Sequence, residues 1–194
     1  MPRIDTRKFY LSAIKKHGVS AKGVNWLSKE NQELRFKEIL QLLPYVLNEY
    51  SLGDAGCGFG DFYSYLIKNN RQLKNYLGID AHIEIVELAS ANREVEILHL
   101  DICKESVPIK DYYVCSGALN ILTYFETHLF IQNCYNSSRK AFIFNTLYGD
   151  KESETYNYLQ KDFIESIAKK LNVKKVIYKE GYLESDITVM FVKK

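Results

Sequence analysis

The chain has 194 residues, of which 46% are hydrophobic and 26% are charged. This length suits one domain, and the composition is that of a globular protein and too apolar for a disordered chain. The 26 basic and 24 acidic side chains leave a net charge of only +2, which argues against a general nucleic-acid-binding protein.

Targeting and metal-binding signals are absent from the sequence. The first residues, Met1 to Asp5, do not form the apolar core of a signal peptide, and no stretch approaches the ~20 apolar residues that span a bilayer. The four cysteines lie far apart without a Cys-x-x-Cys pair, and no two histidines have the His-x-x-x-His spacing. We therefore expect a cytoplasmic protein with no membrane association, no disulfide framework and no metal site.

Two helices are predicted before residue 50. The first spans residues 6–16 and ends before Gly18, a common helix terminator. The second begins after Ser28, whose hydroxyl can cap free backbone amides, and ends near Pro44.

From residue 50 onward, short strands alternate with helices. Strands are predicted at 50–54, 75–79, 95–100, 111–116 and 140–145, and helices at 62–69, 83–91, 124–135 and 154–171. This alternation predicts a parallel sheet with helices on both faces. Two further strands, at 173–178 and 186–192, are too close in sequence for a parallel crossover. The sequence therefore predicts a single α/β domain with a doubly wound, mostly parallel seven-stranded sheet whose last strand is antiparallel.

A glycine-rich turn follows the first predicted strand. Gly56, Gly58 and Gly60 occupy alternate positions. A ligand that crosses the carboxyl edge of such a sheet must approach bare backbone, which side chains would prevent. One glycine is enough for a tight corner, so three within five residues predict a ligand-binding loop.

The glycine spacing and the nearby charges restrict the ligand. The dinucleotide fingerprint G-x-G-x-x-G would place its third glycine at Asp61. The carboxylates of Asp61 and Asp54 would repel a pyrophosphate. The loop therefore favours a ligand with cationic groups and no phosphate, and an NAD-dependent oxidoreductase becomes a less favoured alternative.

The segment Asp54–Gly60 resembles the first motif of the class I S-adenosylmethionine-dependent methyltransferases. Gly78–Asp80, Leu98–Ile102 and Val114–Asn120 fall where that superfamily places its next motifs. Residues 26–36 contain a Ser-x-Glu-x-Gln-x-x-Arg-Phe pattern after an aromatic residue, and with the tail at 181–188 they resemble a small bacterial subgroup of these enzymes.

The resemblance implies a Rossmann-like core over residues 50–194, a helical cap over the site from residues 1–49, and S-adenosylmethionine as the cofactor. One departure is Gly53, which stands where the superfamily usually has a bulky apolar residue. We expect this glycine to loosen the packing around the first strand.

The resemblance also implies roles for individual residues, each with an alternative. Asp80 would accept hydrogen bonds from both ribose hydroxyls, or cap the following helix. Asp101 would hold the adenine amine, with the Ile102 amide at a ring nitrogen, or be a solvated turn residue. Arg35 would bind the methionine carboxylate as a forked pair, or form a surface salt bridge along its own helix. His82 would flank the adenine ring, or cap the next helix.

Asp54 would lie near the methionine amine, directly or through the glycine-loop amides, and Ser116 and Gly117 would border the methionine end. The full set of expected cofactor-binding residues is Asp54, Ala55, Gly56, Cys57, Gly58, Gly60, Asp80, Ala81, His82, Asp101, Ile102, Ser116, Gly117 and Arg35.

Fewer residues are candidates for the acceptor side. Trp26, Tyr148 and Asn120 are expected to face the substrate. His128 is the one histidine that we would test as a catalytic group, with Tyr148 and Asn120 as further catalytic candidates.

We expect a methyltransferase that works by in-line displacement on a small-molecule acceptor. Sulfonium is a good leaving group, and alignment alone supplies about 7–11 kcal/mol in well-oriented reactions, so a strong base is optional. Many methyltransferases that modify aromatic or amide nitrogens carry Asn/Asp-Pro-Pro-aromatic where this chain has Cys115–Ala118, which disfavours that group. The alternatives are a methyltransferase acting on protein or RNA and a non-catalytic module that binds S-adenosylmethionine.

Overall fold

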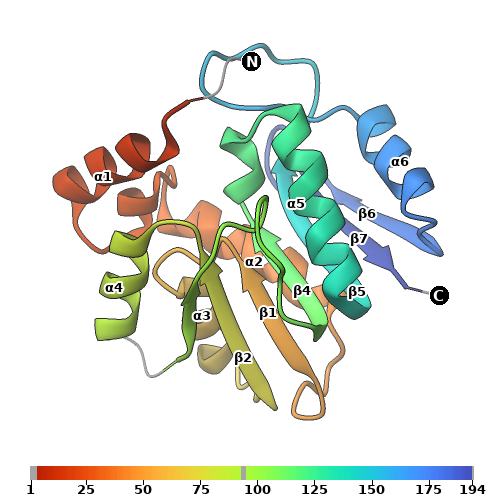
Figure 1. The fold of residues 1–194 in the computed structure, drawn as a ribbon, viewed down its shortest axis with the longest axis horizontal. Helices are drawn as coiled ribbons and strands as arrows, with labels where there is room; N and C mark the ends of the chain where they lie inside the picture. Colours follow the sequence, from red (N-terminus) through yellow and green to blue (C-terminus); the bar gives the residue numbers. More distant parts are fainter. Residues whose placement is uncertain (1–3, 93–94, 194) are drawn as a thin grey trace.

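A computed structural model describes residues 4–92 and 95–193, and their centre is a seven-stranded sheet (Figure 1). The strand order is β3-β2-β1-β4-β5-β7-β6. The first five strands are parallel, whereas β7 is antiparallel to both β5 and β6. The predicted fold class is confirmed. The strand bounds are β1 Ser51–Ala55, β2 Asn75–Asp80, β3 Ile97–His99, β4 Lys110–Ser116, β5 Ser138–Leu147, β6 Lys175–Glu180 and β7 Asp186–Val192.

Helices α1, α2 and α5 begin where a polar side chain accepts a hydrogen bond from a free backbone amide. Ser28 accepts a hydrogen bond from the Asn31 amide, and Thr123 and Glu126 cap each other's backbone at the start of α5. The α-helices are α1 Thr6–His17, α2 Lys29–Leu42, α3 Asp61–Lys68, α4 Ile83–Asn92, α5 Tyr124–Ser137 and α6 Lys161–Lys170. Two 3₁₀ helices, η1 Ala21–Val24 and η2 Ala118–Ile121, complete the described elements.

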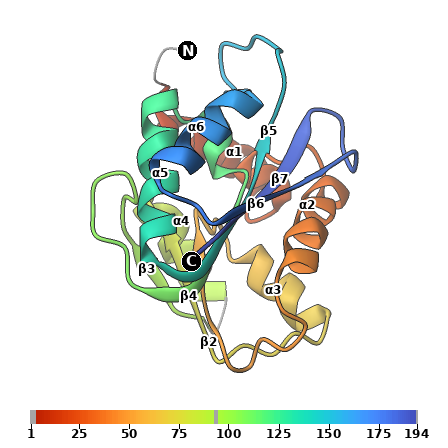
Figure 2. The ribbon, with the colours of Figure 1, turned by 90° about the vertical axis from the view of Figure 1, so that its right-hand side faces the viewer.

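The sheet is buried on both faces, as a parallel sheet requires. Helices α2 and α3 cover one face, and α5 and α6 cover the other (Figure 2). Strand β5 shows the alternation: Ile143 packs into the α2–α3 side, whereas Phe142 and Phe144 pack into the α5–α6 side, and all three are fully buried.

The helix predicted at 154–171 begins later, at Lys161. Residues 148–160 form a loop whose far end returns to β5, because the Leu159 amide donates to Leu147 O at 2.9 Å and the Gly149 amide donates to Leu159 O at 3.1 Å. The Asn157 amide also donates to Asn120 O at 2.6 Å. The prediction for 154–160 was wrong because these tertiary backbone bonds replace helical ones.

Gly53 does not loosen the packing of β1. A Cβ atom at this position would lie 2.2 Å from the ring of Tyr113 on the neighbouring strand β4. Tyr113 is fully buried and occupies the space that a bulky residue at 53 would fill. The expected loosening was therefore wrong.

Among the described residues, no helix has both the length and the apolar character that a membrane span requires.

Candidate functional site

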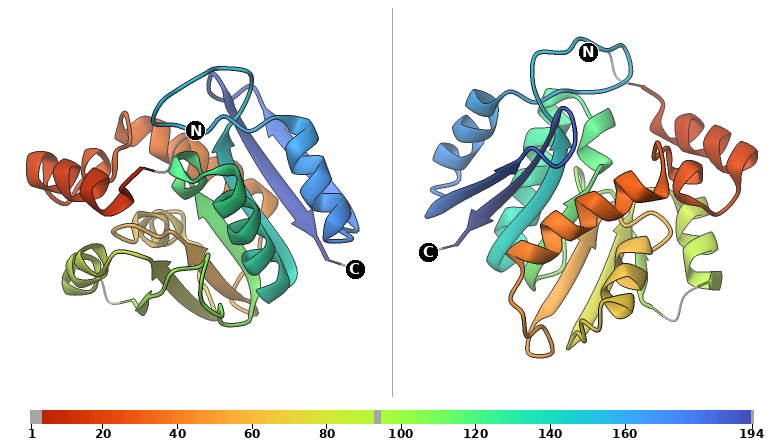
Figure 3. Two further views of the ribbon diagram at one scale, coloured as in Figure 1. Left: turned by 45° about the horizontal axis from the view of Figure 1, so that its top comes forward. Right: turned by 180° about the vertical axis from the view of Figure 1, so that it is seen from behind.

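A cavity of about 510 Å³ opens at the carboxyl edge of the parallel strands. Its floor contains the loop after β1 and the ends of β2 and β4, and its outer wall comes from α1, η1 and the loop after β5. Figure 3 shows α1 and that loop at this same edge. Ligands of doubly wound folds bind at this edge, where the strand order reverses between β1 and β4.

The glycine-rich loop has the backbone geometry that the sequence predicts. Gly56, Gly58 and Gly60 have φ values of 72°, 54° and 76°, a region that other residues rarely adopt. The amides of Gly56 and Cys57 donate to Ile79 O at 2.8 and 3.0 Å, which fixes the loop against β2. A Cβ at Gly56 would lie 2.5 Å from Ala118 Cβ, so a larger residue would not fit.

Asp80 ends β2 beneath the cavity. Its Oδ2 accepts the Gly58 amide at 3.1 Å and its Oδ1 accepts the His82 amide at 3.0 Å. Each oxygen keeps a lone pair for a further donor, which fits a pair of ribose hydroxyls. Burial raises the pKa of this carboxyl, and the His82 amide opposes that effect. Asp80 thus joins the glycine loop to α4 and still faces the cavity.

Two further carboxylates make the cavity floor acidic. Asp54 is buried and accepts a hydrogen bond from the Tyr76 hydroxyl. Burial raises its pKa to about 7, with Tyr76 opposing the shift and Asp80 and Asp61 adding to it. A cationic ligand would favour the ionised form. Asp61, the first residue of α3, accepts a hydrogen bond from Gln32 Nε2 at 3.1 Å.

Asp101 lines the cavity in a tight turn. Its Oδ1 accepts the Cys103 amide at 3.0 Å, and its Oδ2 pairs with Lys104 at 2.6 Å. These bonds correspond to the turn-residue alternative, although the side chain remains at the wall where an adenine amine is expected. Ile102 lines the same wall.

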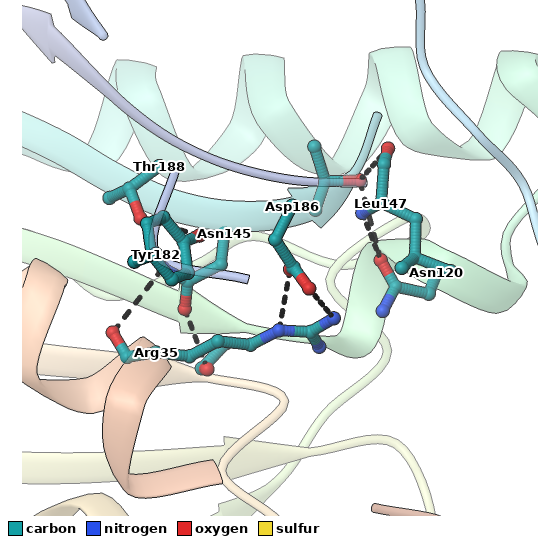
Figure 4. Close-up of polar contacts among 9 residues, drawn as sticks. Arg35, Asn120, Asn145, Leu147, Tyr182, Asp186 and Thr188 are labelled. Carbon is teal, nitrogen blue, oxygen red and sulfur yellow. Dashed lines mark hydrogen bonds and ion pairs between the residues drawn. The ribbon is translucent and has the colours of Figure 1, made fainter. Parts of the chain in front are cut away.

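Arg35 reaches the cavity but already has a carboxylate partner. Its Nε and Nη2 bind the two oxygens of Asp186 on β7 at 2.6 and 2.7 Å (Figure 4). Both side chains are buried, so the alternative role of Arg35, a surface salt bridge along its own helix, is wrong. Nη1 lies 3.6 Å from where a Gly117 Cβ would be, and the guanidinium carbon lies 4.8 Å from the Trp26 ring centroid.

A buried polar network supports the ends of β4 and β5. Ser116 donates to Asn145 Oδ1 at 2.7 Å. Asn145 Nδ2 donates to Thr188 Oγ1 at 2.7 Å, and the Thr188 hydroxyl donates to the Tyr182 hydroxyl at 2.9 Å (Figure 4). Asn120 Oδ1 accepts the Leu147 amide at 2.9 Å, which leaves its amide nitrogen as the donor group at the cavity. The sequence analysis did not identify Asn145. The only feature in the sequence that could have indicated it is a polar residue in an otherwise apolar strand.

Aromatic residues of the cap lie over the site. Tyr10 contacts the His82 ring with centroids 5.4 Å apart, and Phe9 contacts Tyr156 of the loop after β5. The His82 carbonyl accepts the amides of Ile85 and Val86, so His82 also caps α4. Phe9, Tyr10 and Tyr156 were not anticipated from the sequence.

Most of the predicted site residues line this cavity, and four do not. Ala55 is fully buried beneath the floor, and Gly60 caps α3. His128 and Tyr148 are absent from the lining, which removes the geometric support for their proposed catalytic and substrate-facing roles. Trp26, Asn120 and the remaining cofactor-site residues are brought together. Within residues 4–92 and 95–193, no group of His, Cys, Asp or Glu has the geometry of a metal site.

Comparison with solved structures connects this geometry to known proteins. Magnesium protoporphyrin IX methyltransferase from Synechocystis PCC 6803 with bound SAH matches with a TM-score of 0.72 and 12% identity, covering 97% of this chain and 98% of that one. The chain has the fold of the class I S-adenosylmethionine-dependent methyltransferases. The same Synechocystis protein with bound SAM matches with a TM-score of 0.69 and 13% identity over the full length of both chains.

A further match is a SAM-dependent methyltransferase from Archaeoglobus fulgidus, with a TM-score of 0.66, 10% identity, and coverage of 95% of this chain and 99% of that one. No protein-family model and no curated protein sequence matches the chain. The resemblance to class I methyltransferases is thus supported by the fold, whereas the bacterial subgroup stays a prediction.

Proposed function

We propose that the protein is an S-adenosylmethionine-dependent methyltransferase. The observation that carries this proposal is the floor of the cavity, where a glycine loop with left-handed backbone lies between the buried carboxylates of Asp54 and Asp80. This floor presents bare backbone and negative charge to a ligand. A nucleoside with cationic groups fits such a floor, and a pyrophosphate does not.

The residues of the cavity divide between binding and orientation. Asp80 would hold the ribose, Asp101 and Ile102 the adenine, and Asp54 the cationic end of the cofactor. S-adenosylmethionine supplies an electrophilic methyl group whose transfer leaves a neutral thioether. The protein's contribution is to align the acceptor and to exclude water, because the sulfonium is already a good leaving group and a strong base is optional. The proton that the acceptor loses would pass to bulk solvent as the methylated product leaves the cavity.

We propose a small-molecule acceptor rather than a polymer. The cap helix α1, η1 and the 148–160 loop all contribute to the wall of the cavity, and Phe9 of α1 packs edge to face against Tyr156 of that loop. A wall built from these three segments leaves more room for a small molecule than for a protein or RNA chain. The four cysteines are free thiols, which is consistent with our proposal that the protein acts in the cytoplasm.

Calorimetry with S-adenosylmethionine, S-adenosylhomocysteine and NAD tests the cofactor. We expect saturable binding of the first two compounds and none of NAD; the reverse would support an oxidoreductase instead. Mass spectrometry of a small-molecule library incubated with the protein and S-adenosylmethionine then tests turnover. Binding without any methylated product would favour the non-catalytic module.

A further inference from the structure

We give the name acceptor chamber to a set of five residues of the cavity wall: Phe9, Asn25, Trp26, Asn120 and Tyr156. All five line the cavity. None is among the residues that the cofactor is expected to contact. The acceptor chamber is therefore the part of the wall that the expected cofactor contacts leave to an acceptor.

Contacts connect several members of the acceptor chamber to one another or to its neighbours. The Phe9 and Tyr156 rings meet edge to face, with centroids 6.4 Å apart, and the Asn157 amide ties this loop to Asn120 O at 2.6 Å. The Trp26 ring covers Gly117, lying 3.0 Å from where its Cβ would be. Asn25 precedes Trp26 and shares a second hollow beneath α1 with Phe9.

Asn25 carries an unused hydrogen-bond donor. Its Nδ2 is buried and has no hydrogen-bond partner within the described part of the chain. Its backbone is left-handed, with φ 62° and ψ 26°, and is held by a bond from its amide to Lys22 O at 3.0 Å. An orphaned buried donor costs free energy, so an oxygen of a bound molecule is its natural partner.

Apart from Asn25 and Asn120, the acceptor chamber consists of aromatic side chains, and none of its five residues is charged. Arg35 stacks on Trp26, but Asp186 neutralises it through two contacts. Asn120 has its oxygen bound to the Leu147 amide, so it also offers a donor. Rings favour flat molecules by stacking and edge contacts, and amide N–H groups favour oxygen over ammonium.

We propose that the acceptor is a flat aromatic molecule with a hydrogen-bond-accepting oxygen, held by the rings of the acceptor chamber and by the side-chain amide of Asn25. This inference rests on the proposed function. Asn25 is on this view a residue that determines acceptor specificity.

Three probes of similar size test the proposal on the protein saturated with S-adenosylhomocysteine. Acetophenone combines an aromatic ring with a carbonyl, benzylamine replaces the carbonyl by an ammonium group, and cyclohexyl methyl ketone replaces the aromatic ring. Dissociation constants come from ligand-observed NMR titrations. We expect acetophenone to bind at least about fivefold more tightly than either other probe. Equal binding of the three, or a preference for benzylamine, would overturn the proposal.

The Asn25→Asp variant tests the residue itself, because aspartate keeps the shape and tolerates left-handed backbone while replacing the donor by an acceptor. We expect the preference to reverse, with benzylamine gaining and acetophenone losing about tenfold in affinity. Asn70→Asp is the matched control, since Asn70 is an exposed asparagine with φ 55° outside the cavity lining. It should leave all three affinities unchanged.

Cofactor binding separates this inference from the proposed function. If Asn25→Asp weakens S-adenosylhomocysteine but not methylthioadenosine, which lacks the amino-acid tail, Asn25 serves the cofactor and the acceptor assignment is wrong. If the wild-type protein does not bind S-adenosylhomocysteine, the proposed function fails and the inference fails with it.

Discussion

Among single residues, Asp80 has the most specific expected role. Both of its oxygens accept hydrogen bonds from backbone amides, one in the glycine loop and one at the start of α4. These bonds fix the direction of the remaining lone pairs. We expect Asp80→Asn to weaken S-adenosylhomocysteine by about 1.5–3 kcal/mol, the range for hydrogen bonds to charged groups. Calorimetry measures the loss, with Asp162→Asn on α6 as a control outside the cavity. An unchanged affinity in a folded Asp80→Asn protein would contradict the ribose role.

Asp54 gives the stability of the protein a predictable dependence on pH. Its pKa is raised from the ordinary 3.8 to about 7 by burial, so the folded state holds the proton more tightly than the unfolded state. The contribution of Asp54 to the free energy of unfolding is fully present below pH 3.8. It decreases as the pH rises to about 7, by at most about 4 kcal/mol in total.

The comparison with Asp54→Asn isolates this effect, because the variant has no proton to lose at this position. We expect the free energy of unfolding of the wild type, measured with urea, to fall relative to the variant between pH 4 and pH 7.5. A constant difference between the two proteins across that range would show that Asp54 keeps an ordinary pKa.

At the scale of elements, the packing of β1 against β4 depends on Gly53, because the ring of Tyr113 on β4 occupies the space that a side chain at position 53 would need. The Tyr113 hydroxyl donates a hydrogen bond to Pro108 O, which fixes the position of the ring. The ring therefore cannot move aside to relieve a clash with a methyl group added at position 53. We expect Gly53→Ala to lower the free energy of unfolding by about 1–3 kcal/mol. In a Tyr113→Ala background the same change should cost much less, because the space is then open. Equal costs in the two backgrounds, measured by urea unfolding, would refute the coupling.

Elements were easier to predict from the sequence than their tertiary partners. The glycine loop, Asp80 and the antiparallel β7 follow from local spacing, because turn chemistry and the length of a crossover are local properties. The start of α6 was missed because Asn157 and Leu159 bond to distant backbone. The partner of Arg35 was missed for the same reason, since Asp186 lies 151 residues away. Asn25 could not be identified from the sequence, because its proposed role depends on the burial of its side-chain amide, and residue spacing does not show burial.

For the whole molecule, the pair of Arg35 and Asp186 is a buried link between α2 and β7, and so between the cap and the far side of the sheet. Burial raises the pKa of Asp186 and Arg35 opposes that effect, so the carboxylate depends on its partner. Removing one member of a buried pair leaves an uncompensated charge and costs about 3–5 kcal/mol, whereas apolar replacement of both is often neutral.

We therefore expect Arg35→Met to lose about 3–5 kcal/mol of unfolding free energy at pH 7, and Arg35→Met with Asp186→Leu to recover most of it. A double variant as unstable as Arg35→Met would mean that the two residues matter separately and not as a pair.

Trp26 is the only tryptophan and lies in the cap, so its fluorescence reports the cap while far-UV circular dichroism reports the whole fold. The two signals should move together in urea for the wild type, as in a two-state transition. A fluorescence change at a lower urea concentration than the circular dichroism change would mean that the cap unfolds by itself.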